Sequence, residues 1–344
     1  MQQLLTFEER GIYCPSADIY IDPWSPVERA IITHAHSDHA RRGCRHYLAH
    51  LHSVPILKLR LGADIQITGL DYNKPVVING VRFSLHPAGH MIGSAQVRVE
   101  YKGEVWVVSG DYKLDSDGLA APFESVRCHH FVTESTFALP IYRFPTPEYI
   151  HEEINEWWRR NKSEKLTSVL IGYSVGKAQR LMKHLDSSIG DIFTHETVAN
   201  VNNAYRQAGL LWDVPERASA EFDASRHRGS LVIAPPSILA SPWLRPFEPY
   251  STGYASGWML LRSMRRRAGF DRGFVLSDHA DWDQLNEAVR STSAQHVCVM
   301  HGYSSAFTRW LRENQSVDAV EVERLRPNRV EHANGMKDVN EEVH

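Results

Sequence analysis

Short apolar runs that end at polar or charged residues recur along the first part of the chain, and this pattern predicts many short strands. Residues 96–101 alternate between polar and apolar side chains, which is the period of a half-buried strand. Lys102-Gly103 then predicts a turn, so residues 104–108 are expected to return as the second strand of a hairpin. Up to Phe137 the pattern therefore predicts a layered sheet region.

The pattern changes at Thr146-Pro147, which predicts the start of a helix because proline is tolerated in the first helical turn. Apolar residues follow at helical spacing, among them Trp157 and Trp158. We expect these two tryptophans to pack in a core rather than to form a platform on which bases stack.

Strands and helices then alternate as far as about Arg272. The predicted strands cover residues 169–172, 192–194 and 231–234, and the predicted helices cover 177–185 and 198–208. This alternation favours a small parallel sheet, inserted into the first domain. From Gly273 on, apolar strands that end at histidine return. The expected organisation is a first domain over residues 1–143 and 273–325, an inserted α/β domain over 144–272 and a mobile charged tail over 326–344.

Composition is that of a globular protein with room for two domains: 344 residues, 42% hydrophobic and 23% charged. The four cysteines lie far apart, which argues against a disulfide framework or a cysteine zinc site and favours a reducing, cytoplasmic environment. The first residues lack the apolar core of a secretory signal, and no run approaches the roughly 18 apolar residues needed to span a bilayer. We therefore expect no membrane partner.

The net charge of -3 is unfavourable for a protein that binds phosphates. Two basic clusters, one between Arg262 and Arg272 and one between Arg159 and Lys165, stand out from this background. Either could contact a nucleic acid strand, and either could be a solvated helix face. Charge alone does not decide between these interpretations.

Four metal-binding side chains, His34, His36, Asp38 and His39, lie within six residues directly after an apolar strand. Neutral imidazoles combined with carboxylates suit zinc better than magnesium. The alternative is a histidine-rich surface loop in a chain with 19 histidines. The length of the pattern and its place at the end of a strand favour the metal site.

Further candidate ligands follow other short apolar strands in the same manner. His90, Asp111 and His301 each come after such a run and are flanked by small residues, and His279 lies in the segment Ser277-Asp278-His279. Residues at strand ends converge over the rim of a sheet, so these side chains are expected to meet.

This ordered set resembles the metallo-β-lactamase superfamily and, within it, the β-CASP nuclease branch. In chain order the matching residues are Asp22 for the first motif, His34, His36, Asp38 and His39 for the second, His90 for the third, Asp111 for the fourth, and Glu134, His279 and His301 for the three β-CASP motifs. The resemblance covers roughly residues 10 to 320. Chain length and the segments 172–177 and 256–259 look most like the bacterial DNA-ligase-associated exonucleases, relatives of the crosslink-repair exonucleases and Artemis.

The resemblance implies a four-layer αββα sandwich with an inserted β-CASP α/β domain and an active site in the cleft between the two. It implies two zinc ions, with manganese as an alternative. His34, His36 and His90 would bind one ion, Asp38, His39 and His301 the other, and Asp111 would bridge them, with Asp22 as a structural carboxylate beneath the metal loop.

The same resemblance implies a catalytic set of Asp38, Asp111, Glu134 and His279. A hydroxide bridging the two ions would attack phosphorus, because zinc brings the pKa of bound water toward ~7. His279 would act as general acid for the leaving oxygen, and Glu134 would orient it and keep it protonated. An imidazole suits this role because its ordinary pKa of about 6.5 allows proton donation near neutrality.

A second group with possible chemistry is Ser174-Val175-Gly176-Lys177, which follows a strand and opens a helix. Backbone N–H groups, a hydroxyl and an ammonium at a helix start favour an anion. In the crosslink-repair relatives this segment helps to hold a terminal 5′-phosphate, and Ser237 and Ser256 lie at similar strand ends. The alternative is an ordinary helix start with a solvated lysine.

The favoured function is a dizinc phosphodiesterase that degrades DNA from a 5′ end in repair, with a DNA ligase and a helicase as partners implied by the subgroup. The alternative is an RNA-processing endo- or exoribonuclease of the same family. His301 favours that alternative, because the eukaryotic DNA-specific members usually lack a histidine at this motif. A binding-only scaffold is disfavoured because every ligand position is filled. A small-molecule hydrolase is disfavoured by the inserted domain and by the His279 motif.

Overall fold

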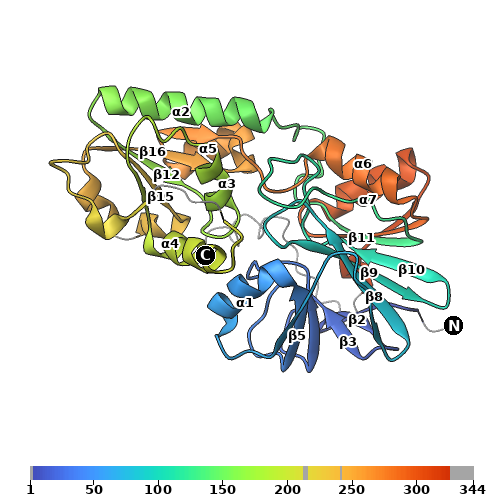
Figure 1. Ribbon diagram of the computed structural model, residues 1–344. Helices are drawn as coiled ribbons and strands as arrows, with labels where there is room; N and C mark the ends of the chain where they lie inside the picture. The colour runs from blue at the N-terminus through green and yellow to red at the C-terminus, as the bar shows by residue number, and fades with distance from the viewer. Residues whose placement is uncertain (1–2, 212–215, 241, 326–344) are drawn as a thin grey trace. The chain divides into compact units, whose positions relative to one another are not determined.

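The computed structural model describes residues 3–211, 216–240 and 242–325, so the tail predicted over residues 326–344 lies outside them (Figure 1). The described residues form two compact units, one with the residues up to Arg143 and from His279 on, the other from Phe144 to Asp278. The return to the first domain was expected at Gly273. It comes later because β17 (Arg272–Phe274) pairs with β16 (Tyr250–Ala255) in the sheet of the second unit.

The first unit contains two sheets of six and seven strands. The first sheet consists, in order, of β1 (Thr6–Glu8), β2 (Gly11–Cys14), β3 (Ile19–Ile21), β4 (Arg29–Ile32), β5 (His46–His50) and β6 (Ile67–Leu70). The second consists, in order, of β19 (Asp318–Glu321), β18 (His296–Met300), β11 (His130–Glu134), β10 (Glu104–Val108), β9 (Ala95–Tyr101), β8 (Val81–Pro87) and β7 (Val76–Ile78).

Apolar side chains fill the space between these two sheets. Ile21 and Ile31 from the first sheet belong to one buried cluster with Phe83, Val97 and Trp106 from the second. The other face of the second sheet is covered by α6 (Trp282–Thr292) and α7 (Ser304–Asn314), whose apolar faces share a second buried cluster with β11 and β18 (Figure 1). This burial stabilises the strands whose ends carry the candidate ligands.

The hairpin predicted over residues 96–108 is confirmed, because β9 and β10 pair in antiparallel register through Glu104 and Tyr101. Lys102 and Gly103 both have positive φ, 49° and 85°. A two-residue turn of this kind matches the twist of the flanking strands and favours glycine. On the other side of the unit, α1 (Val54–Leu61) follows β5 after the 3-10 turn Leu51–Ser53.

The second unit is built on the parallel sheet that the alternation of strands and helices predicted. Its order is β14 (Arg217–Ala218), β13 (Ile192–Thr194), β15 (Leu231–Ala234), β12 (Thr167–Ile171), β16 and β17, and every pair is parallel. Its helices are α2 (Pro147–Ser163), α3 (Lys177–Lys183), α4 (Glu196–Gln207) and α5 (Arg262–Ala268). Trp157 and Trp158 on α2 are both buried, which confirms their predicted place in the core.

Short 3-10 segments complete the described chain, at Ser219–Glu221, Pro236–Ala240, Pro242–Phe247, Gly257–Leu260 and Val322–Arg324. Sheets flanked by helices confirm the predicted α/β class. None of the helices in the described residues is long and apolar enough to cross a membrane.

The strand directions bring four of the candidate site residues of the first unit to one edge of the second sheet, while His34 to His39 follow β4 of the first sheet. β10, β11 and β18 are parallel neighbours, and they end just before Asp111, at Glu134 and just before His301. β8 is antiparallel to β9, which is antiparallel to β10, so β8 also ends at this edge, just before His90. The carboxyl ends of parallel strands are the usual place for a site in α/β folds.

Candidate metal centre

Two groups of ligand atoms meet at Asp111. The first group is His34, His36, His90 and Asp111, whose ligand atoms all lie within 4.8 Å of one another. Nε2 of His34 is 3.3 Å and Nε2 of His90 is 3.8 Å from Oδ2 of Asp111. His90 Nε2 also lies 3.1 Å from Nδ1 of His36. His34 and His90 are fully buried, whereas His36 lies at the edge of the centre.

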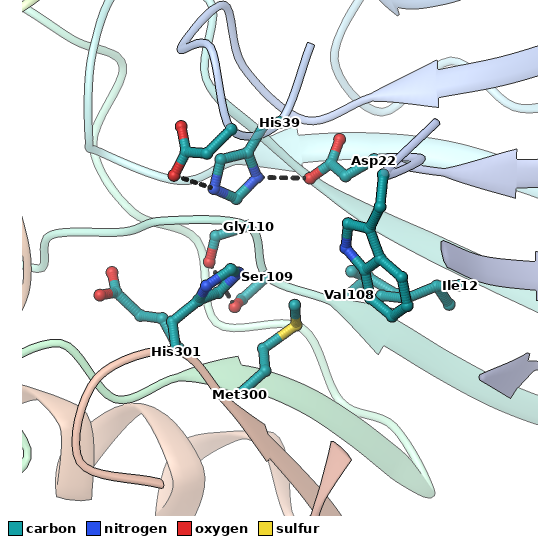
Figure 2. A pocket seen from close by; sticks show the side chains of 11 residues that line it. Ile12, Asp22, His39, Val108, Ser109, Gly110, Met300 and His301 are labelled. Carbon is teal, nitrogen blue, oxygen red and sulfur yellow. Dashed lines mark hydrogen bonds and ion pairs between the residues drawn. The ribbon is translucent and has the colours of Figure 1, made fainter. Parts of the chain in front are cut away.

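The second group is Asp38, His39 and Asp111. His39 Nε2 lies 3.5 Å from Oδ2 of Asp38 and 3.4 Å from Oδ1 of Asp111. The two oxygens of Asp111 thus face different groups. His301 does not join this group at the same distance: its ring centroid is 5.5 Å from that of His39. It lines the same cavity as Asp38 and His39 (Figure 2).

Asp22 fixes the loop that carries His34 to His39, which we call the metal loop. Its carboxylate accepts hydrogen bonds from the backbone N–H and the hydroxyl of Thr33, at 2.8 and 2.6 Å. It also accepts the Nδ1–H of His39 at 2.7 Å (Figure 2). A proton on Nδ1 leaves Nε2 of His39 as the nitrogen that faces Asp38 and Asp111. Ligand histidines in metal sites are usually oriented by such a carboxylate.

The residues present fit divalent ions. Nε2 of His34 and Nε2 of His39 are buried and have no hydrogen-bond partner among the described residues. A buried polar atom without a partner is unfavourable, so these nitrogens indicate a missing ligand. Two atoms bound to one zinc ion at tetrahedral angles would lie about 3.4 Å apart, close to the spacings around Asp111. Imidazoles with carboxylates suit zinc or manganese.

The charges of the centre are strongly coupled. Burial raises the pKa of Asp38, but His39, His34 and His36 outweigh this effect and lower it to about 2. Burial likewise opposes charge on His39, yet Asp111, Asp38 and Asp22 hold the pKa of His39 well above its ordinary value. The pKa of His90 is held well below its ordinary value by burial and by the neighbouring histidines. Asp38 and Asp111 therefore stay ionised near neutrality and His90 stays neutral, and these are the forms that bind a metal cation.

Two glycines allow the ligand loops to approach each other closely. Gly110 precedes Asp111 with φ of 58°, and a Cβ there would lie 2.6 Å from the Thr33 hydroxyl oxygen. Gly89 precedes His90 with φ of 77°, and a Cβ there would overlap the carbonyl oxygen of Lys113. Because both positions exclude a side chain, the loops that carry the ligands pack directly on one another.

His279 and Glu134 form a pair next to this centre. Nδ1 of His279 is 2.9 Å from Oε2 of Glu134. That carboxylate also accepts the N–H of Tyr112 at 2.8 Å and the hydroxyl of Thr136 at 2.6 Å, so its orientation is fixed. Asp111, Glu134 and His279 have ligand atoms within 4.8 Å of one another. The predicted general acid and its orienting carboxylate thus lie beside the shared Asp111.

The residues predicted to bind a terminal phosphate all lie in the second unit. Ser174, Gly176 and Lys177 follow β12, Ser237 follows β15 and Ser256 follows β16, at the carboxyl ends of three adjacent parallel strands. Four of them already have partners, Lys177 among them. Ser174 Oγ lies 2.9 Å from Oγ1 of Thr197, Gly176 N–H donates to Gln179, and Ser256 Oγ accepts from Trp258 N–H. Ser237 is exposed.

Lys177 lies in a buried ion-pair cluster. Its ammonium is 3.0 Å from Oδ2 of Asp278 and donates to the carbonyl of Leu276 at 2.7 Å. Arg180, fully buried one turn further along α3, pairs with the other oxygen of Asp278. A phosphate bound here would have to share both cations with Asp278. Sequence reasoning missed this arrangement, because no local pattern connects α3 with residue 278.

Sequence reasoning also missed three residues between positions 53 and 72 that support the first ligand group. Ser53 Oγ donates to the carbonyl of Gly93 at 2.8 Å, and Tyr72 OH donates to the carbonyl of Ser94 at 2.8 Å. Both carbonyls belong to the turn that follows His90. Arg60 on α1 donates to the carbonyl of Ala35, between His34 and His36. These contacts join distant segments, so no spacing in the sequence indicates them.

Fold and site together define an α/β protein with a cluster of histidines and aspartates that could hold metal. No family model matches the chain. A protein from Opitutus terrae named "Probable DNA ligase" is 31% identical over 306 residues, which cover 88% of this chain and 30% of that protein. "Endoribonuclease YSH1" from Eremothecium gossypii is 27% identical over 123 residues, covering 35% of this chain and 16% of that protein. "Endoribonuclease YSH1" from Candida albicans is 21% identical over 300 residues, covering 70% of this chain and 34% of that protein.

The chain thus spans about a third or less of the length of these curated relatives. Among solved structures, the crystal structure of a protein of unknown function from Enterococcus faecalis matches with a TM-score of 0.59 at 12% identity. The match covers 85% of this chain and 78% of that one. At this identity the likeness concerns the fold alone.

Proposed function

We propose that this chain is a metal-dependent nuclease of the metallo-β-lactamase/β-CASP type that hydrolyses phosphodiester bonds with two divalent ions. One observation carries the proposal: Asp111 faces two separate ligand groups, each with a buried histidine nitrogen that has no hydrogen-bond partner among the described residues. Relatives with nuclease and ligase names support a nucleic acid as the substrate.

Each residue of the centre has a defined task in such a reaction. His34, His36, His90 and Asp111 would hold one ion, and Asp38, His39 and Asp111 the other, with His301 close to the second. Bound divalent ions would supply positive charge for the transition state and a water of lowered pKa. Asp22 keeps Nδ1 of His39 protonated, which directs Nε2 toward the ion.

His279 is the proton donor in this proposal. The Nδ1–H of His279 donates to Glu134, so a second proton on Nε2 is the one that can pass to the leaving oxygen. Buried Glu134, fixed by Tyr112 and Thr136, accepts the Nδ1–H and holds the plane of the ring. Glu134 is therefore a positioning residue, and His279 acts on the reacting atoms.

DNA is the substrate that we favour, and cleavage from a 5′ end in DNA repair is the favoured mode. The relative named "Probable DNA ligase" matches 88% of this chain, whereas the first of the endoribonuclease matches covers 35%. We propose that the protein acts together with a DNA ligase and a helicase in the cytoplasm. The 5′-end preference depends on the proposed phosphate pocket of Ser174, Gly176, Lys177, Ser237 and Ser256.

RNA cleavage is the second candidate. It is supported by the names of the endoribonuclease relatives and by the histidine at position 301. In this reading the phosphate pocket has no role, and internal cuts would not depend on the chemistry of the 5′ end.

A time course on internally labelled DNA and RNA oligonucleotides of matched sequence, each with a 5′-phosphate or a 5′-hydroxyl, tests these proposals. The variant Asp38→Ala/His39→Ala removes ligands of one ion, and His46→Ala, an exposed histidine outside the centre, is the matched control. Mononucleotide release from 5′-phosphorylated DNA that is lost only in the ligand variant is the expected result. Cleavage of RNA alone would select the second candidate, and cleavage that persists in the ligand variant would exclude the metal centre as the active site.

A further inference from the structure

Residues 39–63, which begin within the metal loop, contain five lysines and arginines and no aspartate or glutamate. In a chain with a net charge of -3, this segment is strongly basic. The cations are Arg41, Arg42, Arg45, Lys58 and Arg60. Two of them directly follow the metal loop, and two lie in the last turn of α1.

The fold brings Arg42 to the C-terminal end of α1, next to the turn that carries Lys58 and Arg60. Nη2 of Arg42 lies 3.9 Å from the place where a Cβ on Gly62 would stand, and Gly62 is the residue that caps the C-terminus of α1. The guanidinium of Arg60 reaches the carbonyl of Ala35, inside the metal loop. We call Arg41, Arg42, Lys58 and Arg60 the basic face. It adjoins the exposed side of the loop that carries His36 and Asp38.

Three members of the basic face are available to a ligand. Arg41, Arg42 and Lys58 are exposed, and none forms an ion pair with a residue that the structure describes. Arg45 differs, because it pairs with Glu28 at 3.0 Å, and it is therefore left out of the face. Two acids border the segment: Asp38 directly precedes it, and Asp64 directly follows it, with its Oδ1 3.1 Å from the Cβ position of Gly62.

Helix stability explains only part of this arrangement. Lys58 and Arg60 lie in the last turn of α1, where cations interact favourably with the helix dipole. Arg41 and Arg42 lie on no helix, so the helix dipole does not account for them. Arginines and lysines that gather on one surface without acidic partners are typical of a surface that binds a polyanion. Phosphodiester backbones are polyanions whose binding depends on such side chains.

We infer that the basic face binds the phosphodiester backbone of a nucleic acid strand next to the metal centre. The inference rests on the proposed function and deepens it by naming a surface that the strand contacts. It differs from the two basic clusters of the second unit, around residues 159–165 and 262–272, to which the sequence pattern drew attention.

The test is the salt dependence of binding to single-stranded oligonucleotides with cleavage-resistant phosphorothioate linkages, in DNA and RNA forms, measured by fluorescence anisotropy. The variant is Arg41→Gln/Arg42→Gln. The matched control, Arg10→Gln/Arg127→Gln, removes two exposed arginines of the same unit that form no ion pair with a described residue. The slope of log K against log salt should become shallower by about 1.4 in the first variant, since each phosphate contact contributes about 0.7 on single strands. Arg41→Lys/Arg42→Lys should keep the slope of the unmodified protein.

The outcomes distinguish a failure of the basic-face inference from a failure of the proposed nuclease function. Equal changes in both glutamine variants, or none in either, would overturn the inference while cleavage by the unmodified protein still supports a nuclease. If the unmodified protein neither binds nor cleaves the oligonucleotides, the proposed function fails and the inference fails with it. A slope change on DNA alone or on RNA alone supports the face and identifies the strand.

Discussion

The metal centre of the first unit and the Lys177 cluster of the second unit were singled out by the same signal, polar residues directly after a buried strand. In the metal centre, the fold leaves two buried histidine nitrogens without a hydrogen-bond partner among the described residues. In the Lys177 cluster, the ammonium and the guanidinium of Arg180 are paired with Asp278. One group is complete only with a ligand, and the other is held together by its own charges.

This difference teaches how a buried polar cluster should be interpreted. Buried polar atoms normally find partners, so atoms that lack them point to a ligand. A buried ion pair with good geometry satisfies itself, and breaking it is strongly unfavourable. We therefore expect variants in the first cluster to lose metal and activity, and variants in the second to lose stability first.

Replacing Asp111 should have the largest effect on activity. Asp111→Ala removes the carboxylate that both ligand groups share, so at least one ion should be lost and nuclease activity should fall by more than about a thousandfold, since one electrostatic contact to a transition state is already worth roughly 10²–10³. Metal content by plasma emission spectrometry and cleavage rates measure both effects. If Asp111→Ala keeps two ions per chain, the shared-ligand interpretation is wrong.

Replacing Asp278 should have the largest effect on stability. Asp278→Asn leaves Lys177 and Arg180 as buried cations without their carboxylate, and losing one partner of a buried pair typically destabilises by about 3–5 kcal/mol. Urea unfolding monitored by circular dichroism measures the change, and the exposed Asp64→Asn is the matched control. A change below about 1 kcal/mol, together with a lost preference for 5′-phosphorylated ends in Lys177→Met, would instead favour a phosphate-binding role.

Much of the fold and of the metal centre could be predicted from the sequence. The strands are short and directly precede His34, His90, Asp111 and His301, so their periodicity and their polar ends are local signals. The parallel sheet of the second unit followed from the alternation of strands and helices. Local pattern also predicted the hairpin at Lys102-Gly103, because its turn depends on two adjacent residues.

The rest depends on contacts between distant segments. Arg60 donates to the carbonyl of Ala35, and Tyr72 donates to the carbonyl of Ser94. No local pattern in the sequence specifies which distant segment either side chain contacts. The boundary after Asp278 was missed for a related reason: Arg272–Phe274 has the same apolar pattern as a strand of the first unit, but it pairs with β16. A strand's sequence shows that it is buried and does not show which sheet it joins.

Stability should also depend on pH, because a buried histidine, His50, packs against Tyr72, one of the residues that support the first ligand group. His50 is fully buried, stacks on Tyr72 at 3.5 Å between ring centroids, and accepts the N–H of His52. Burial, with His52 beside it, lowers the pKa of His50 to about 4. Because the unfolded chain then binds a proton more readily, stability is complete above about pH 6.5 and falls as pH decreases toward 4, by roughly 3 kcal/mol.

Urea unfolding of the metal-free protein between pH 7 and pH 4 measures this loss. In His50→Phe, which keeps an aromatic ring against Tyr72, the part of the loss that His50 causes should disappear. The exposed His46→Phe should retain it. Identical pH profiles for all three proteins would show that His50 does not titrate as its burial indicates.

The smallest expected effects are changes in metal affinity that concern one ligand group at a time. Tyr72 holds the turn after His90 through one hydrogen bond to Ser94, whereas Asp22 holds His39 directly. Tyr72→Phe should weaken only the ion of the first group, by about tenfold, and Asp22→Asn should weaken the ion of the second group by about 10- to 100-fold, as is usual for residues that orient a ligand. Stepwise titration of the metal-free protein with cobalt, followed by its visible spectrum, resolves the two ions.

These two variants together test whether the two ligand groups are supported separately, because each variant serves as the control for the other. If the supports act separately, each variant shifts a different step of the cobalt titration and leaves the other unchanged. A shift of both steps in Tyr72→Phe would mean that the turn after His90 also holds Asp111, which is plausible physically because Ala88 O accepts the N–H of Lys113 at 3.0 Å. The two ions would then respond as one cooperative unit, and the distinction between two separately supported groups would have to be abandoned.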